Sequence, residues 1–292
     1  MTPRSSRIVA LVVVLAVLAG CSGAGGRRAT GASSSGGVAA TGTDAPVEPG
    51  TAVGGSSAIG PTSAIDAPTA PHDGATRSAP LPSPGGPGSF AMRYLRPAAS
   101  GQITIAALVQ SGASPQAGTL DHLGSILHQV SGKPVAVTTR TVGGGSTSWT
   151  GDTLAAVADA SSPAPTADTA VLTVLFLHGD YEGDTSVLGI ATRGDVAAVF
   201  VDQLAASAGL LGAVAPIERA VSTHEMGHLL GLVDLVLHTG RQDPDHPGHS
   251  TNPASVMYWA VESDLVGQLL GANPPTEFDS ADLADLATIR NS

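Results

Sequence analysis

Residues 224–231 read HEMGHLLG, and residues 249–258 read HSTNPASVMY. The first segment lies in a region of helical periodicity, and residues four apart share one face of a helix. The imidazoles of His224 and His228 can therefore hold one tetrahedral metal ion, and the carboxylate of Glu225 can reach water beside it. This pattern predicts a zinc site in which His224 and His228 are ligands and Glu225 is the general base.

The helix that carries these residues is expected from about Pro216 to Leu230. Proline is favoured in the first turn of a helix. Gly231 can adopt a positive φ, which would end the helix and turn the chain sharply. Such a turn allows a side chain from a later segment to return to the metal as a third ligand.

The pattern HExxHxxG resembles that of the metzincin clan of zinc endopeptidases. In that clan a third ligand normally lies three residues after the glycine, and this position is Asp234 here. Residues 249–258 also resemble the matrixin segment that runs from the third histidine into the Met-turn. They are similar as well to the archaemetzincin tail, with Ser250 and Ser255 in place of two cysteines. In these two families the third ligand corresponds to His249.

The resemblance thus implies two candidates for the third ligand. His249 is favoured because both tails place the ligand there and because a neutral imidazole suits zinc at neutral pH. Asp234 could instead accept a hydrogen bond from a ligating imidazole. The resemblance also implies that Met257 forms an apolar floor beneath the metal, whereas Tyr258 is not expected to be catalytic. Residues 234–248 would form an inserted loop, which is either solvated, close to the cleft or a second ion site.

Alternating strands and helices are expected around this site. Strands are predicted at 102–110, 135–142, 169–177, 188–192 and 197–202, and helices at 114–131, 152–160, 203–211 and from about 278. The apolar run TAVLTVLFL at 169–177 is typical of a central strand that is buried on both faces.

With the resemblance, this order implies an α+β, zincin-like fold. It would contain a mixed, mostly parallel twisted sheet with an edge strand over the cleft, a central HExxH helix, a Met-turn and a C-terminal helix. In the similar families the edge strand pairs with an extended peptide, and residues 188–202 are the candidate for that role.

The N-terminal part of the chain has the composition of an exported and tethered protein. Residues 1–20 combine two arginines with a short apolar run, which predicts a signal peptide. The sequence LAGC that ends at Cys21 resembles a bacterial lipobox, so Cys21 is expected to be lipidated. Residues 21–89 are rich in Gly, Ser, Ala, Thr and Pro and predict a disordered tether. Residues 90–292 are long enough for one zincin-like metalloprotease domain.

Composition restricts the partners of the chain. It has 13 Lys and Arg against 24 Asp and Glu, a formal net charge of −11, which argues against the basic surface that nucleic-acid binding requires. Cys21 is the only cysteine, so an internal disulfide is excluded. We expect a monomer that is anchored to the cell membrane through Cys21, faces the extracytoplasmic side and acts on a peptide or protein.

The residues and the resemblance together imply a zinc endopeptidase with Zn²⁺ as cofactor, acting outside the cytoplasm. Zinc would polarise the scissile carbonyl, and Glu225 would take a proton from water and pass it to the leaving amine. Two alternatives remain open. One is a non-catalytic zinc-binding or interaction lipoprotein of the same fold, and the other is a zinc amidohydrolase that acts on a non-peptide amide. Glu225 favours catalysis, because a purely structural zinc site has no use for a general base.

Overall fold

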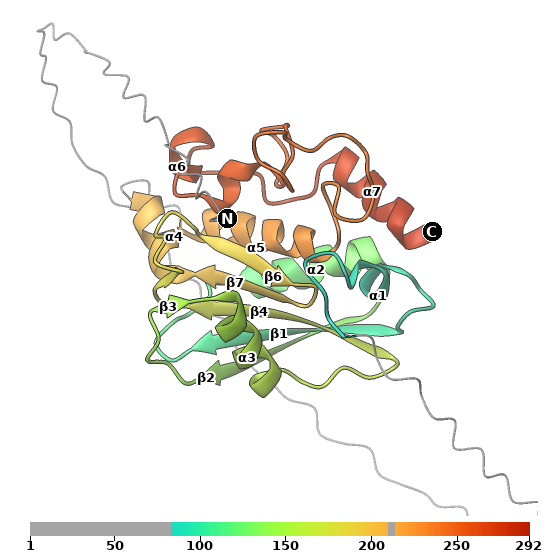
Figure 1. Ribbon diagram of the computed structural model, residues 1–292, viewed down its shortest axis with the longest axis horizontal. Helices are drawn as coiled ribbons and strands as arrows, with labels where there is room; N and C mark the ends of the chain where they lie inside the picture. The colour runs from blue at the N-terminus through green and yellow to red at the C-terminus, as the bar shows by residue number, and fades with distance from the viewer. Residues whose placement is uncertain (1–82, 210–213) are drawn as a thin grey trace, which may run out of the picture. The chain divides into compact units, whose positions relative to one another are not determined.

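A five-stranded sheet with the strand order β2-β1-β4-β7-β6 forms the centre of the fold (Figure 1). Its strands are β1 (Gln102–Gln110), β2 (Val135–Val142), β4 (Thr169–Leu177), β6 (Gly189–Arg193) and β7 (Val196–Phe200). The first four in this spatial order run parallel, and β6 pairs antiparallel with β7 at the edge. The predicted fold class is confirmed, because the sheet is mixed and mostly parallel.

The computed structural model describes residues 83–209 and 214–292, which belong to one unit of the chain. The expected signal peptide (1–20), the expected lipidation site Cys21 and most of the expected tether lie outside these residues. Residues 210 and 211, the end of a predicted helix, lie outside them as well. Within the described residues, the folded part begins before Phe90, because the carbonyl of Gly85 accepts a hydrogen bond from the amide of Gly194 at 2.9 Å.

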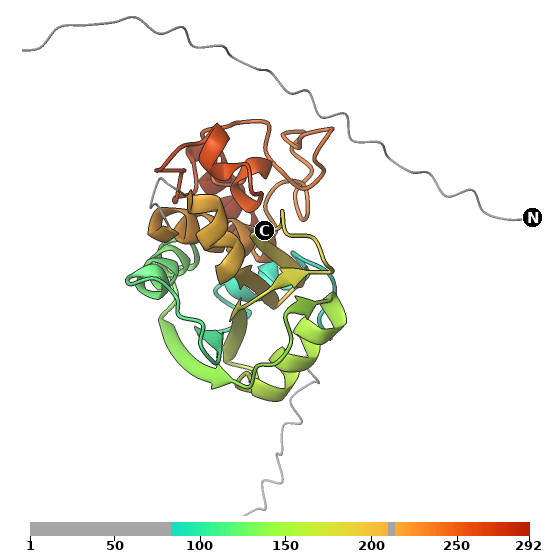
Figure 2. The same ribbon diagram turned by 90° about the vertical axis from the view of Figure 1, so that its left-hand side faces the viewer.

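Helices cover both faces of the sheet (Figures 1 and 2). One face carries α1, α2, α5 and α7, and the other carries α3. Their bounds are α1 (Ala91–Leu95), α2 (Thr119–Ser131), α3 (Gly151–Ser161), α4 (Val201–Ala208), α5 (Val214–Leu229), α6 (Val266–Leu269) and α7 (Ser280–Asn291). A short 3₁₀ helix, η2 (Trp259–Glu262), and a two-stranded sheet of β3 (Ser148–Trp149) and β5 (Asp180–Tyr181) complete the described elements.

Strand β4 shows why the sheet is covered on both faces. Eight of its nine residues are buried, as its continuous apolar run predicts. Successive side chains on a strand point to opposite faces. Phe176 accordingly packs in the core beneath α2 and α5, whereas Leu175 and Leu177 pack in the core beneath α3.

The starts of three helices differ from the predicted ones. Helix α4 begins at Val201 and not at residue 203, so the strand predicted at 197–202 ends earlier, at Phe200. Helix α2 begins at Thr119 and not near residue 114, because Gly118 adopts φ +83° and the chain turns before the helix. Helix α7 begins after Asp279, whose carboxylate accepts hydrogen bonds from the amides of Ala281 and Asp282. The starts of α2 and α7 are set by local backbone and capping geometry, to which the apolar period is insensitive.

The segment between α5 and α7 lies over α5 on the side away from the sheet (Figure 1). It holds only short elements, η2 and α6, and is fixed by side chains that reach α7. Arg241 forms an ion pair with Asp285. Helix α5 is therefore enclosed between the sheet and this segment. Within the described residues, no helix combines the length and the apolar character that crossing a membrane requires.

Lys133, the only lysine of the chain, is buried where α2 leads into β2. Its Nζ donates hydrogen bonds to the carbonyl of Arg93 and to Oγ of Ser100, each at 2.9 Å. Burial lowers the pKa of this amine from 10.5 to about 8, and the positive charge of Arg93 contributes in the same direction.

The unfolding free energy should therefore depend on the titration of Lys133. Between about pH 8 and pH 10.5 the unfolded chain keeps the proton that the folded chain has lost, so this contribution to stability rises with pH. We expect urea unfolding to show that rise, and Lys133→Met to remove it. The other titrating groups are the same in the wild-type protein and in Lys133→Met. If the unfolding free energy had the same slope against pH in both, the lowered pKa of Lys133 would be contradicted.

Candidate metal centre

Helix α5 supplies three of the polar side chains of the site. From Ile217 to Leu229 nearly every residue of this helix is buried, because the sheet lies on one side and the C-terminal segment on the other. A helix that is covered all round normally carries apolar residues. Here the buried positions include His224, Glu225 and His228, so each of these polar groups needs a partner inside the fold.

The two helical imidazoles point their Nε2 atoms at each other. His224 Nε2 and His228 Nε2 are 3.0 Å apart. His224 Nδ1 lies 2.7 Å from the carbonyl oxygen of Val256. A carbonyl can only accept, so His224 donates from Nδ1 and presents the lone pair of Nε2 to the site. Burial lowers the pKa of His228 well below its usual value, and the nearby His224 adds to the effect, so His228 is neutral and able to ligate.

The third imidazole comes from a different segment. Gly231 has φ +85° and ends the helix, and the chain returns through residues 232–248 to His249. The ring centroid of His249 lies 5.1 Å from those of both His224 and His228. The structure thus brings together the three histidines that were predicted from the sequence as metal ligands.

Asp234, the other candidate for the third ligand, serves a different purpose. It adopts φ +63°, and its Oδ1 accepts hydrogen bonds from the amide of Thr239 at 2.7 Å and from its hydroxyl at 3.1 Å. These contacts hold a turn in the loop after α5. Among the described residues, the side chains close enough to share a metal ion are His224, His228, His249 and Glu262, without Asp234.

Glu262 is a site residue that the sequence motifs do not reveal. It ends η2, and its Oε1 lies 2.9 Å from His249 Nε2 while its Oε2 lies 3.5 Å from His224 Nε2. One ligand atom from each of the three histidines and Glu262 falls within 4.8 Å of all the others. The only sequence signal is that Glu262 is the first acid after Met257, and no motif spacing identifies it.

Glu225 is fully buried beside this group. Burial raises the pKa of Glu225 well above its ordinary value, and the neighbouring carboxylate of Glu262 raises it further. Burial alone would raise the pKa of Glu262 as well, but the close imidazoles of His224 and His249 hold it well below its usual range. The pKa values of the two carboxylates are thus shifted in opposite directions, because Glu262 lies against the imidazoles of His224 and His249.

Strand β6 presses directly on Glu225. A Cβ on Gly189 would lie 2.5 Å from Cγ1 of Val221 and 2.8 Å from Oε1 of Glu225, so only glycine permits this approach. Met257 packs against the same helix, since a Cβ on Gly227 would lie 2.3 Å from its Sδ. Met257 is fully buried, and its amide donates to Oγ of Ser255, which closes the turn.

Several polar atoms of the site have no aligned hydrogen-bond partner. They include both carboxylate oxygens of Glu225 and both ring nitrogens of His249. His249 Nε2 is close to Glu262, but the contact lacks the alignment of a hydrogen bond. Unpaired buried polar groups are unfavourable, and a cation held by the three imidazoles would give one ring nitrogen of His249 a partner. The donor set of three imidazoles fits zinc, which prefers nitrogen ligands in tetrahedral geometry.

A hollow of about 260 Å³ opens beside the metal-binding group. It is lined by Val187 at the approach to β6, by Trp259 and His246, and by His249 and Glu262. The ring of His246 stacks on Trp259, with centroids 4.3 Å apart and an angle of 9° between the planes. The loop predicted at 234–248 therefore contributes a wall to the site.

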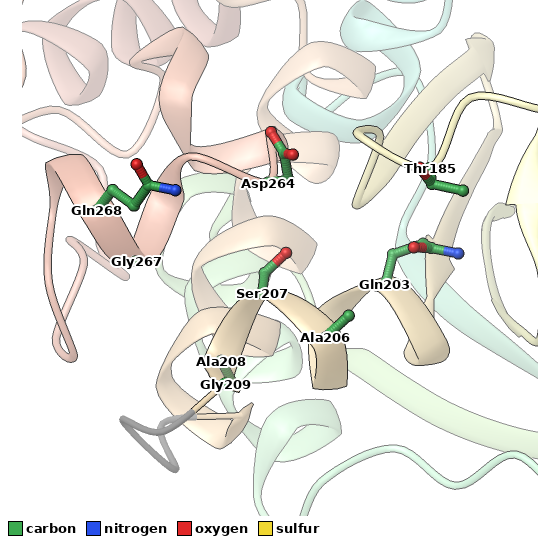
Figure 3. Close-up of a pocket in the computed structure, with 9 residues that line it drawn as sticks. All are labelled: Thr185, Gln203, Ala206, Ser207, Ala208, Gly209, Asp264, Gly267 and Gln268. Carbon is green, nitrogen blue, oxygen red and sulfur yellow. The ribbon is translucent and has the colours of Figure 1, made fainter. Parts of the chain in front are cut away.

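A larger hollow of about 440 Å³ lies between α4 and α6 (Figure 3). Gln203 and Ser207 of α4 face Asp264 and Gln268 across it. The described residues that line this hollow include one acid and no histidine, so they offer no set of metal ligands. The group around His224 is therefore the candidate site.

No protein-family model and no curated protein sequence matches the chain. Similar solved structures include the archaemetzincin of Archaeoglobus fulgidus, with 18% identity over 63% of this chain and 99% of that chain and a TM-score of 0.39. The archaemetzincin of Methanopyrus kandleri shows 17% identity over 66% and 97% and a TM-score of 0.46. A zinc-dependent peptidase from Methanocorpusculum labreanum shows 17% identity over 62% and 99% and a TM-score of 0.40. These identities of 17–18% are low.

The contact between β6 and α5 predicts a specific sensitivity at Gly189. Gly189→Ala should lower the free energy of unfolding by about 1–3 kcal/mol, because the added methyl group overlaps Val221 and Glu225 in a closed space. Urea denaturation measures this change. The control is Gly151→Ala at the start of α3, where the nearest atom to the added Cβ is 3.7 Å away. Equal stability of the two variants would show that β6 does not press on Glu225.

Proposed function

We propose that this protein is a zinc-dependent peptidase in which His224, His228 and His249 hold the metal and Glu225 is the general base. The observation that carries the proposal is the convergence of three imidazoles, from α5 and from a separate loop, beside a buried carboxylate without an aligned hydrogen bond. A site that served only to stabilise the fold would not need Glu225, which is unfavourable to bury.

Each residue has a distinct part in the proposed reaction. When bound, zinc supplies a Lewis acid that polarises the scissile carbonyl and makes the attacking water more acidic. Glu225 accepts the proton of that water and transfers it to the leaving amine. Burial raises the pKa of Glu225, and this makes its ionised form a stronger base than an exposed glutamate. The hydrogen bond from His224 to Val256 keeps the imidazole in the tautomer that ligates.

The substrate would lie along β6. This strand is at the edge of the sheet and contacts α5 at Glu225. An extended peptide can add to such an edge through main-chain hydrogen bonds, which places its carbonyl groups beside the site. The hollow between Val187 and Trp259 would accept one side chain of that peptide. These features favour a peptide over a small non-peptide amide, which makes no use of a strand edge.

Glu225→Gln should separate metal binding from catalysis. We expect it to keep its zinc content and to lower kcat/KM for peptide cleavage by about 10²- to 10⁴-fold, because the general base is lost. His249→Ala should lose zinc affinity, whereas Asp234→Asn should retain both zinc and activity, because Asp234 bonds to Thr239. The measurements are zinc stoichiometry and cleavage of a mixed peptide library, with and without a chelator.

The outcomes of this series discriminate between functions. Undiminished cleavage by Glu225→Gln would refute the mechanism. Normal zinc content in His249→Ala together with loss in Asp234→Asn would make Asp234 the third ligand. Zinc binding by the wild-type protein without cleavage of any peptide would favour a non-catalytic binding protein or an amidohydrolase.

We further propose that a lipid anchor holds the peptidase at the membrane and that it acts outside the cytoplasm. The support is the sequence of residues 1–21, with its arginines, its apolar run and Cys21 in a lipobox-like context. Cys21→Ala should shift the protein from the membrane fraction to a soluble fraction in a bacterial host, with Ser22→Ala as the matched control. Retention of Cys21→Ala in the membrane would argue against the anchor.

A further inference from the structure

Glu262 is held beside the edge strand by its own backbone. Its carbonyl accepts a hydrogen bond from the amide of Leu188 at 2.8 Å, and Ser263 forms a β-bridge with Val187. The residues that lead into β6 are therefore joined to η2 and the residue after it by main-chain hydrogen bonds. The carboxylate of Glu262 points from this support towards the histidines.

The distances around Glu262 match those of a metal ligand. In a tetrahedral zinc site with bonds of about 2.0–2.1 Å, neighbouring ligand atoms lie about 3.3 Å apart. Here the distance is 3.0 Å from His224 Nε2 to His228 Nε2, 3.5 Å from His224 Nε2 to Glu262 Oε2 and 2.9 Å from His249 Nε2 to Glu262 Oε1. All three fall within a few tenths of an ångström of the expected edge length. The two contacts of Glu262 come from its two different oxygens, so they fit a carboxylate that could supply the fourth ligand, at the position that a peptidase needs open.

We propose that Glu262 is the fourth ligand of the resting metal centre and that an incoming substrate displaces it. This inference rests on the proposed function, because it takes the three histidines as the other ligands. Without substrate the carboxylate closes the site, and with substrate it leaves and frees one coordination position. The centre is then a closed zinc site at rest and an open one during turnover.

Glu262 is the ligand best placed to leave. Its side chain is 27% exposed, whereas those of His224 and His249 are 0% and 13% exposed. It also lines the hollow beside the site, so a substrate side chain that enters the hollow meets this carboxylate. His224 cannot leave as readily, because its Nδ1 is bonded to Val256 within a covered helix.

Cobalt substitution of the full-length protein tests the ligand role without measuring activity. Because Co²⁺ absorption reports the number and type of ligands, the spectrum of Glu262→Ala should differ from that of the wild-type protein. Its zinc affinity should fall by about tenfold or more. Added acetate should restore the wild-type spectrum in Glu262→Ala, because a free carboxylate can take the empty corner. Acetate should leave the wild-type spectrum unchanged.

Asp264→Asn is the matched control, since it removes an exposed acid two residues away and should behave as the wild-type protein. If circular dichroism shows that Glu262→Ala is not folded, Glu262→Gln serves for the cobalt spectrum and the zinc affinity, both of which should still change. Unchanged spectrum and zinc affinity in the Glu262 variant would overturn this inference and leave the proposed function standing. Failure of the wild-type protein to bind Co²⁺ or zinc would overturn both.

Discussion

The structure depends on the burial of one polar helix between a sheet and a loop segment. Helix α5 buries His224, Glu225 and His228, and the burial of polar groups without partners is unfavourable by roughly 1–3 kcal/mol for each group. The fold compensates with groups brought from elsewhere. The carbonyl of Val256 accepts a hydrogen bond from Nδ1 of His224, and His249 and Glu262 complete a group that could hold a cation.

This constraint explains features that look unrelated along the chain. Gly189 is required because strand β6 must pass against Glu225 without a side chain between them. The positive φ of Gly231 is required because the helix must end at once, so that the chain can return over it. Ser255 and Asp282 form a buried hydrogen bond at 2.8 Å that joins the Met257 turn to α7. Each feature keeps either β6 or the segment between α5 and α7 packed against helix α5.

The same packing places the two carboxylates in different surroundings. Glu225 is enclosed by β6, and its pKa is raised by burial, which suits a base. Glu262 faces the imidazoles, and His224 and His249 hold its pKa down, which suits a ligand. In the proposed site, Glu262 therefore closes the metal centre as a ligand and Glu225 acts as the general base. Stability at rest and reactivity with substrate need not compete if Glu262 is the group that moves.

The sequence alone determined the elements that follow from local periodicity. The bounds of β1, β2 and β4 agree with the predicted ranges, and α5 agrees to within two residues, because an apolar period of two or of 3.6 residues is a local property. The sequence also placed His224, Glu225 and His228 together, since their spacing lies within a single helical turn. It left His249 and Asp234 as alternatives, because each follows a turn whose path no local pattern specifies.

Only the tertiary structure decided how the segment between α5 and α7 packs against helix α5. It brought His249 to the group and turned Asp234 towards Thr239. It also revealed Glu262 and the stacking of His246 on Trp259. The contact between His224 and Val256 spans 32 residues, most of them in irregular backbone without a hydrophobic period. Such contacts depend on where a loop is attached to the rest of the fold. Here Arg241 forms an ion pair with Asp285 of α7, and the amide of Leu188 donates a hydrogen bond to the carbonyl of Glu262 in η2. Long-range contacts of this kind form only in the folded chain.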